Sequence, residues 1–208
     1  MAKTRVVMLC SQKGGAGKTT TTLHLAAECQ ARGETAIVID DDQQGSAVAW
    51  ARTRGPQKPP SVYPSHGRAA EIVEAAKADG IGVVLIDTEP RASGRVLQLA
   101  RLVDVHVVVA RPTALDLHAA LETVKALQGA GHRPRVVLNG AVPRVPETEE
   151  ARQFFAKTGA DVWPGALHNR VSYQRALSTG ATVSEIEPKG EGAKEIRDLA
   201  EWIMNAKS

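Results

Sequence analysis

The segment most suited to chemistry is a glycine-rich run that contains two lysines. Residues 11–20 read Ser-Gln-Lys-Gly-Gly-Ala-Gly-Lys-Thr-Thr and lie between a short apolar run and a segment of helical character. Small residues in such a loop let backbone N–H groups point at phosphate oxygens, and the following helix N-terminus favours an anion. Lys18 is then expected to reach the β- and γ-phosphates of a nucleotide, and the Thr19 hydroxyl to ligate Mg²⁺. The expected nucleotide-binding residues here are Gly14, Gly15, Ala16, Gly17, Lys18, Thr19 and Thr20.

This loop departs from the standard phosphate-loop pattern at two positions. The standard pattern has a glycine five positions before Gly17, where this sequence has Gln12, and it has no lysine where this sequence has Lys13. A glycine-rich turn that only caps the next helix is the simpler alternative. The strand and helix expected on either side of the loop favour phosphate binding over that alternative.

Carboxylates follow two other apolar runs. Asp87 directly follows the run Val-Val-Leu-Ile, which is the form of a Walker B motif, whose acid holds Mg²⁺ through its water shell. Residues 38–46 read Val-Ile-Asp-Asp-Asp-Gln-Gln-Gly-Ser. Asp41 or Asp42 could instead cap a turn or the helix that begins near Ser46, and for Asp41 we favour that interpretation.

A sheet must bring these residues together. Short β-branched runs alternate with helical stretches, which predicts an α/β fold with a doubly wound, mostly parallel sheet flanked by helices. Ligands of such folds bind at the carboxyl ends of the strands, where the loop and the acids fall. The prolines of residues 52–68, with no acidic residue among them, predict an irregular surface excursion. The predicted strands are Arg5 to Cys10, Thr35 to Asp40, Ile81 to Asp87, Val103 to Ala110 and Arg135 to Asn139, and the predicted helices are Lys18 to Arg32, Arg68 to Lys77, Ser93 to Arg101, Leu115 to Gln128, Glu147 to Lys157 and about Ala193 to Asn205.

Length and composition agree with this fold. The 208 residues, 43% hydrophobic and 24% charged, suit one domain over residues 1–208. Two cysteines are too few for a disulfide scaffold or a four-thiolate metal site, so we expect a reducing, cytoplasmic setting. No stretch approaches the ~20 apolar residues that span a bilayer, so no membrane contact is expected. The net charge of +3 permits contact with nucleic acid without requiring it.

The glycine-rich loop resembles the deviant Walker A motif of the ParA/MinD family of ATPases, whose signature lysine matches Lys13. The resemblance implies a P-loop NTPase fold, ATP and Mg²⁺ as cofactors, and a homodimer formed with ATP. In that family the signature lysine crosses the dimer interface and contacts the partner's phosphates. Two Lys13 ammonium groups are difficult to bring together without anionic phosphates between them, so ATP is expected to hold the dimer together.

The resemblance extends to the carboxylates. The Asp-x-Asp-x-Gln-Gly spacing is similar to the family's switch I segment, usually Asp-x-Asp-Pro-Gln-Gly, with Gln43 in place of proline. Asp40 matches the acid that assists Mg²⁺ and the attacking water, and Glu89 departs from the frequent Asp-Thr-Pro-Pro. The resemblance implies slow ATP hydrolysis by positioning and charge neutralisation. It makes Lys13, Lys18 and Asp40 catalytic, and Thr19, Asp40 and Asp87 metal-binding.

The expected base of the nucleotide is adenine. A guanine-specific Asn-Lys-x-Asp motif requires an acid three residues after Asn139, and that position holds Val142. Asn139 at a strand end resembles the residue that meets adenine in some relatives. Asn-Gly is also an ordinary turn dipeptide, so both interpretations of Asn139 stay open.

The C-terminal part, residues 168–194, is similar to that of small plasmid-partition ParA proteins. The resemblance implies non-specific DNA binding by the ATP dimer, because two copies double the phosphate contacts. A solvated basic face is the alternative for any single residue. The chain starts close to its first strand, so we expect no N-terminal helix-turn-helix domain and no operator-specific repression. The candidate DNA-binding residues are Arg170, Arg175, Lys189 and Lys194.

Together these observations favour a cytoplasmic, nucleoid-associated ATPase switch for plasmid or chromosome partition. An adaptor of the ParB type, or another cargo-bound protein, is expected to stimulate hydrolysis. The alternatives are a MinD-like positioning ATPase at the membrane, against which the absence of an amphipathic tail argues, and a metabolic synthetase on the same scaffold.

Overall fold

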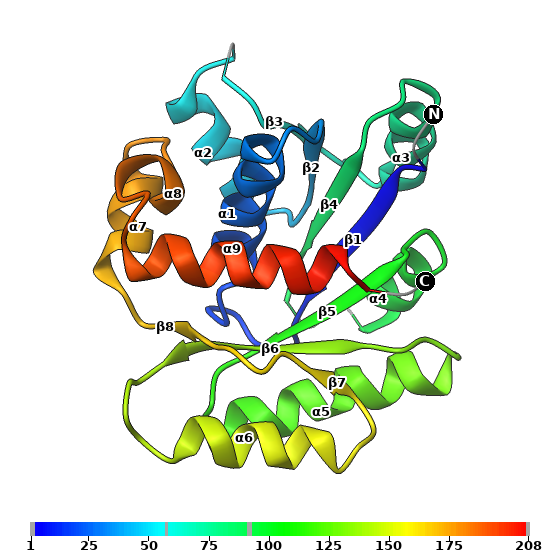
Figure 1. Cartoon of the computed structure of the whole chain (residues 1–208). Coiled ribbons are helices and arrows are strands. Elements are labelled where there is room, and N and C mark those ends of the chain that lie inside the picture. Colours follow the sequence, from blue (N-terminus) through cyan, green and yellow to red (C-terminus); the bar gives the residue numbers. More distant parts are fainter. Residues whose placement is uncertain (1–2, 57, 91–92, 207–208) are drawn as a thin grey trace.

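The computed structural model, which describes residues 3–56, 58–90 and 93–206, has a parallel sheet covered by helices on both faces (Figure 1). Its strands are β1 (Arg5–Cys10), β2 (Ala36–Asp41), β3 (Ser61–Pro64), β4 (Val83–Thr88), β5 (Val105–Ala110), β6 (Arg135–Ala141), β7 (Asp161–Val162) and β8 (Leu167–His168). They run in the order β3-β2-β4-β1-β5-β6-β7, with β8 paired to β6. The predicted doubly wound α/β fold is confirmed.

Alternation along the strands divides the apolar residues between two layers. Val7 and Leu9 face one layer, and Val6 and Met8 face the other, because successive strand residues point to opposite sides. The first layer is closed by α1, α2, α7, α8 and α9, and the second by α3, α4, α5 and α6. The helices are α1 (Lys18–Ala31), α2 (Ser46–Arg54), α3 (Ala69–Ala78), α4 (Ser93–Ala100), α5 (Ala114–Gly129), α6 (Glu147–Ala156), α7 (Val171–Ser178), α8 (Val183–Ile186) and α9 (Glu191–Met204).

Strand order places the candidate residues at one edge of the sheet. The central strand β1 pairs with β4 on one side and with β5 on the other. Strands β2 to β4 therefore lie on one side of β1, and strands β5 to β7 lie on the other. Such a switch point opens a crevice at the carboxyl ends of the strands. The register sets Asp40 of β2 opposite Asp87 of β4, and Leu9 of β1 beside Asp87. The loop after β1 therefore meets both acidic strand ends.

The prediction of an irregular excursion over residues 52–68 is wrong in part. The segment includes the end of α2 and the strand β3, which pairs in parallel with β2. A strand that contains Pro64 is tolerated here because β3 is the outermost strand of the sheet, where a missing N–H breaks no ladder on the open side.

The last helix packs on the sheet. Ile196, Leu199, Ala200 and Ile203 of α9 are buried in the first layer, as their spacing predicts. Both cysteines are free and buried, and burial raises the pKa of each thiol to about 12. Among the helices described, none has the length and apolar character needed to cross a membrane.

Candidate functional site

The glycine-rich loop joins β1 to α1, which begins at Lys18. Gly15 and Gly17 have positive φ values of 72° and 94°, a backbone conformation that side chains disfavour. A Cβ atom on Gly17 would lie 1.9 Å from Asn139 Nδ2, so this position has no room for a side chain. Asn139 Nδ2 donates to the Ala16 carbonyl at 2.6 Å and joins β6 to the loop.

Lys18 is a buried cation close to the carboxylates of Asp87 and Asp42. Burial lowers the pKa of its ammonium group, while the nearby Asp87 and Asp42 act in the opposite direction. Lys18 forms no ion pair within 4.0 Å in the described residues, so its buried ammonium group is suited to hold an anion. The contact of Lys18 to nucleotide phosphates stays a prediction.

Thr19 and Asp87 form the second half of the site. Thr19 Oγ1 donates to Asp87 Oδ2 at 2.6 Å, and burial raises the pKa of Asp87 to about 7. The other carboxylate oxygen, Oδ1, is buried and has no hydrogen-bond partner within the described ranges. An unpartnered buried carboxylate oxygen beside a threonine hydroxyl fits a hard divalent cation such as Mg²⁺. Thr19 and Asp87 are the residues that could hold it.

Asp40 has a different immediate environment. Its Oδ2 accepts from Val48 N at 2.9 Å, its Oδ1 accepts from Asp42 N at 3.2 Å, and burial raises its pKa. These bonds hold the first turn of α2 and the loop before it. The carboxylate is thus already engaged by backbone donors on both oxygens.

Asp42 is a candidate for which the sequence left a functional and a capping role open. Its Oδ1 accepts from Gln44 N at 2.9 Å in a turn, and its charge is close enough to act on both Lys18 and Asp87. The signal that could have found it is the spacing of Asp40 and Asp42, because residues two apart on an extended segment point to one side.

The preferred interpretation of Asp41 as a cap is wrong. Arg95 of α4 donates to both carboxylate oxygens of Asp41, at 2.7 and 2.8 Å, and Ser65 Oγ also donates to it. The Asp41 side chain is only 4% exposed. The ion pair ties the end of β2 to the helix that follows β4, a tertiary contact that local turn chemistry could not predict.

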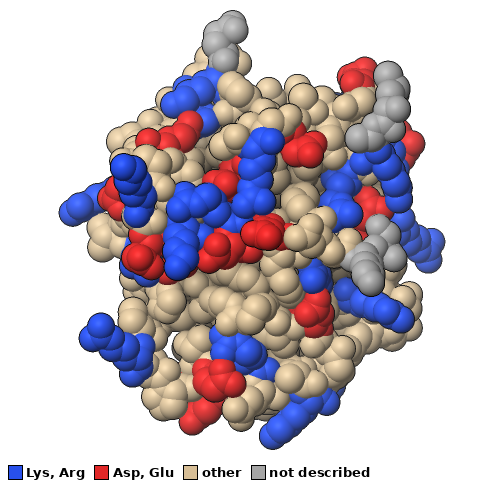
Figure 2. Space-filling model, in the orientation of Figure 1, with Lys and Arg blue, Asp and Glu red and all other residues tan. Residues whose placement is uncertain are grey.

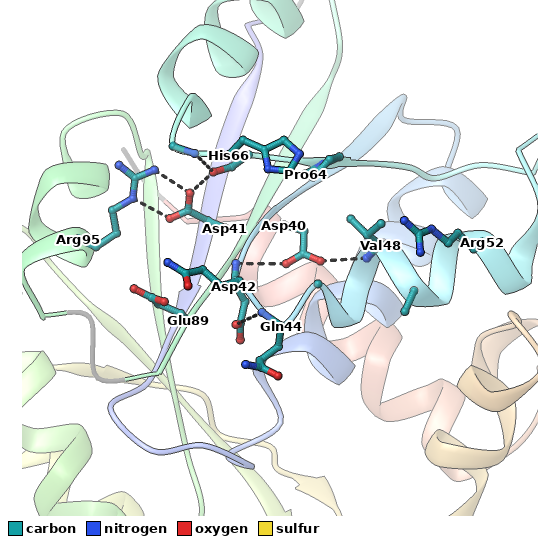
Figure 3. Close-up of a pocket in the computed structure, with 15 residues that line it drawn as sticks. Asp40, Asp41, Asp42, Gln44, Val48, Arg52, Pro64, His66, Glu89 and Arg95 are labelled. Carbon is teal, nitrogen blue, oxygen red and sulfur yellow. Dashed lines mark hydrogen bonds and ion pairs between the residues drawn. The ribbon is translucent and has the colours of Figure 1, made fainter.

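A cleft of about 860 Å³ opens beside these acids (Figure 3). Its walls come from the ends of β2 and β3, the start of α2 and Arg95 of α4. Asp42 and Glu89 lie on the same side of the cleft as the Asp41–Arg95 pair, and Arg52 projects from α2 (Figure 3). The cleft leaves solvent access to the acidic end of the site.

Lys13 and Lys18 lie in contrasting surroundings although they belong to one loop. Lys13 is 40% exposed, and its Nζ lies 3.4 Å from Asp116 Oδ2 in the first turn of α5. Thr113 Oγ1 caps that helix and donates to the same carboxylate. Lys13 is therefore available at the surface, while Lys18 is committed to the interior of the site.

The predicted DNA-binding residues fall into two groups. Arg170 donates twice to Glu195 Oε1, at 2.6 and 3.0 Å, and is engaged within the fold. Arg175 of α7, Lys189, and Lys194 of α9 are exposed. Basic and acidic side chains alternate over α9 in the space-filling view (Figure 2).

Comparison with known proteins gives relatives along most of the chain. The family model described as CobQ/CobB/MinD/ParA nucleotide binding domain matches residues 7–183. Maintenance of carboxysome distribution protein A of Gloeobacter kilaueensis is 30% identical and aligns over 92% of this chain and 88% of its own. The chromosome-partitioning ATPase Soj of Thermus thermophilus is also 30% identical, over 98% of this chain and 96% of its own.

Solved structures share the fold. MinD in the MinC:MinD cell division complex of Aquifex aeolicus superposes with a TM-score of 0.81 at 16% identity, covering 98% of this chain and 97% of that chain. A complex of a Cyanothece McdA variant with ATP gives a TM-score of 0.76 at 15% identity, covering 100% of this chain and 99% of that chain. At such identities the likeness concerns the fold.

Proposed function

Because the chain belongs to the CobQ/CobB/MinD/ParA family of nucleotide-binding domains, we propose that it is an ATPase that dimerises with ATP and positions or partitions a cargo. Relatives named for chromosome partitioning and for carboxysome distribution support this proposal. The single observation that carries it is the pair of lysines in one loop, one buried among carboxylates and one at the surface.

The residues at the carboxyl edge take separate roles in hydrolysis. The loop amides of residues 14–20 and Lys18 bind the phosphates, and Thr19 and Asp87 are the side chains that hold Mg²⁺. When bound, the metal neutralises charge on the transferred phosphoryl group. Asp40 keeps the segment after β2 in place through its two backbone donors. In this proposal Asp42, whose charge acts on both Lys18 and Asp87, takes the role of orienting the attacking water that the resemblance gave to Asp40. Turnover is slow because the described site offers no strong base beside these carboxylates.

The proposed dimer uses Lys13. In the described residues its ammonium group pairs with Asp116 at 3.4 Å, and the lysine side chain is 40% exposed. Lys13 can exchange this partner at little cost, because ion pairs open to solvent contribute about 0–1 kcal/mol. In the dimer Lys13 leaves Asp116 and contacts the triphosphate bound by the partner copy. In this proposal Asn139 contacts the adenine, and its hydrogen bond to the Ala16 carbonyl keeps it beside the loop.

The ATP dimer binds DNA without sequence specificity through exposed basic residues. Arg175, Lys189 and Lys194 are exposed in each copy, and a dimer presents twice their number to the phosphate backbone. Arg170 contributes mainly by fixing the start of α7. A ParB-type or other cargo-bound adaptor then stimulates hydrolysis and releases the dimer, at the nucleoid in the cytoplasm.

The test is the oligomeric state of Lys13→Ala with and without ATP and Mg²⁺, measured by size-exclusion chromatography with light scattering. Wild type is expected to become a dimer only with ATP, and Lys13→Ala to bind ATP but stay monomeric. Lys125→Ala is the matched control, because Lys125 is also an exposed lysine with a surface ion pair. An undiminished ATP dimer in Lys13→Ala contradicts the crossing role.

A further inference from the structure

Arg111, which belongs to none of the sequence motifs, lies next to the glycine-rich loop of residues 11–20. It is the first residue after β5 and is exposed. The aliphatic part of its side chain lies next to Gly140. A Cβ atom built on Gly140 would lie 3.7 Å from Arg111 Cγ and Nε. Its tip reaches the loop, where a Cβ atom on Gly15 would lie 3.8 Å from Arg111 Nη2. The side chain therefore extends from Gly140 of β6 to Gly15 of the glycine-rich loop.

Three cations converge on this loop, and two have carboxylates near them. Lys18 has Asp87 and Asp42 nearby, and Lys13 pairs with Asp116. For Arg111, no carboxylate within 4.0 Å and no side-chain hydrogen bond is found in residues 3–56, 58–90 and 93–206. A guanidinium at the glycine-rich loop that carries Lys13 and Lys18, without a carboxylate of its own, adds positive charge where an anion would bind.

We infer that Arg111 binds a phosphate group of the nucleotide. The planar guanidinium presents two parallel N–H donors, which match two phosphate oxygens. Its tip lies next to Gly15, one of the loop residues expected to bind phosphate, and Arg111 itself precedes α5, whose Asp116 pairs with Lys13. The phosphate belongs either to the nucleotide of the same copy or, on the dimer proposed above, to that of the partner copy. The chemistry is the same in both cases.

The first arm of the test measures nucleotide affinity in the monomer. Arg111→Gln and Arg111→Lys are made in the Lys13→Ala background, and binding of ATP and of inorganic tripolyphosphate is measured by competition with a fluorescent nucleotide. If the phosphate is that of the same copy, Arg111→Gln lowers both affinities about tenfold, and Arg111→Lys less. Arg133→Gln is the matched control, an exposed arginine before β6 at the opposite edge of the sheet.

The second arm measures the ATP-dependent dimer in the presence of native Lys13. If the phosphate is that of the partner, Arg111→Gln leaves the monomer affinities unchanged and raises the dimer dissociation constant about tenfold. Unchanged values in both arms overturn the inference, as does a loss of ATP affinity without a loss of tripolyphosphate affinity. A wild-type chain that stays monomeric with ATP refutes the dimer proposal, and the first arm alone then decides the role of Arg111.

Discussion

In two charged regions of the molecule, the pKa values of buried carboxylates are shifted in opposite directions. At the carboxyl edge of the sheet, Asp87 is buried, its pKa is raised, and one of its oxygens has no partner in the described residues. On the α7–α9 surface, Glu195 is nearly buried and its pKa is lowered, although burial alone would raise it. The difference is the number of donors that each carboxylate receives.

Glu195 has donors on both oxygens. Arg170 and the His168 ring contact Oε1, and Tyr173 and the His168 backbone N–H contact Oε2. This cluster joins β8 and α7 to α9. Both Glu195 oxygens already accept hydrogen bonds from the protein, so neither is available to a ligand. A buried carboxylate without its full set of partners indicates a ligand site, whereas one with all of them indicates a structural joint.

The largest expected effect is at the carboxyl edge of the sheet, where Asp87 Oδ1 has no hydrogen-bond partner in the described residues. Lys18→Ala should lower ATP affinity about a thousandfold, because removing one member of a buried charge pair costs about 2–5 kcal/mol. The nucleotide-free variant should keep its free energy of unfolding, since burial already disfavours the Lys18 charge. Isothermal titration and urea unfolding measure the two quantities. Full ATP binding by Lys18→Ala contradicts the assignment.

The second prediction concerns His24, which joins α1 to the α7–α9 side. Its Nδ1 accepts from Val183 N at 3.2 Å, and burial lowers its pKa from 6.5 to about 4. Below the unfolded pKa the unfolded chain binds a proton that folded His24 does not. The free energy of unfolding should therefore fall by about 3 kcal/mol as pH falls from 6.5 towards 4.

Urea unfolding across this pH range checks the prediction. His24→Gln should flatten the pH dependence, while the control His118→Gln, at an exposed histidine, should leave it unchanged. Equal pH profiles for wild type and His24→Gln contradict the buried neutral imidazole.

The smallest effects separate the two arginines of the α7 segment. Arg170→Ala should lower the free energy of unfolding by about 2 kcal/mol, because Glu195 loses its charged donor. Arg175→Ala, at an exposed position, should change stability by less than about 0.5 kcal/mol. It should instead weaken DNA binding and reduce the salt slope by about one. Stability losses of equal size at both arginines contradict the distinction.

The sequence by itself determined the phosphate loop, the acidic strand ends and the α/β alternation. The loop at residues 11–20 and the strand-end position of Asp87 depend on local spacing, which the backbone converts directly into geometry. The apolar runs fixed which strands are buried, because a strand covered on both faces must be apolar throughout.

Only the tertiary structure decided which charged side chains are paired within the fold and which are available to a ligand. Asp41 meets Arg95 and Ser65, Arg170 meets Glu195, and Asp40 caps α2 across contacts that spacing along the chain does not encode. The strand β3 also depended on tertiary context, because Pro64 is acceptable only at the edge of the sheet. The physical reason is common to all: the free energy of a charge or of an unpaired N–H depends on what packs against it.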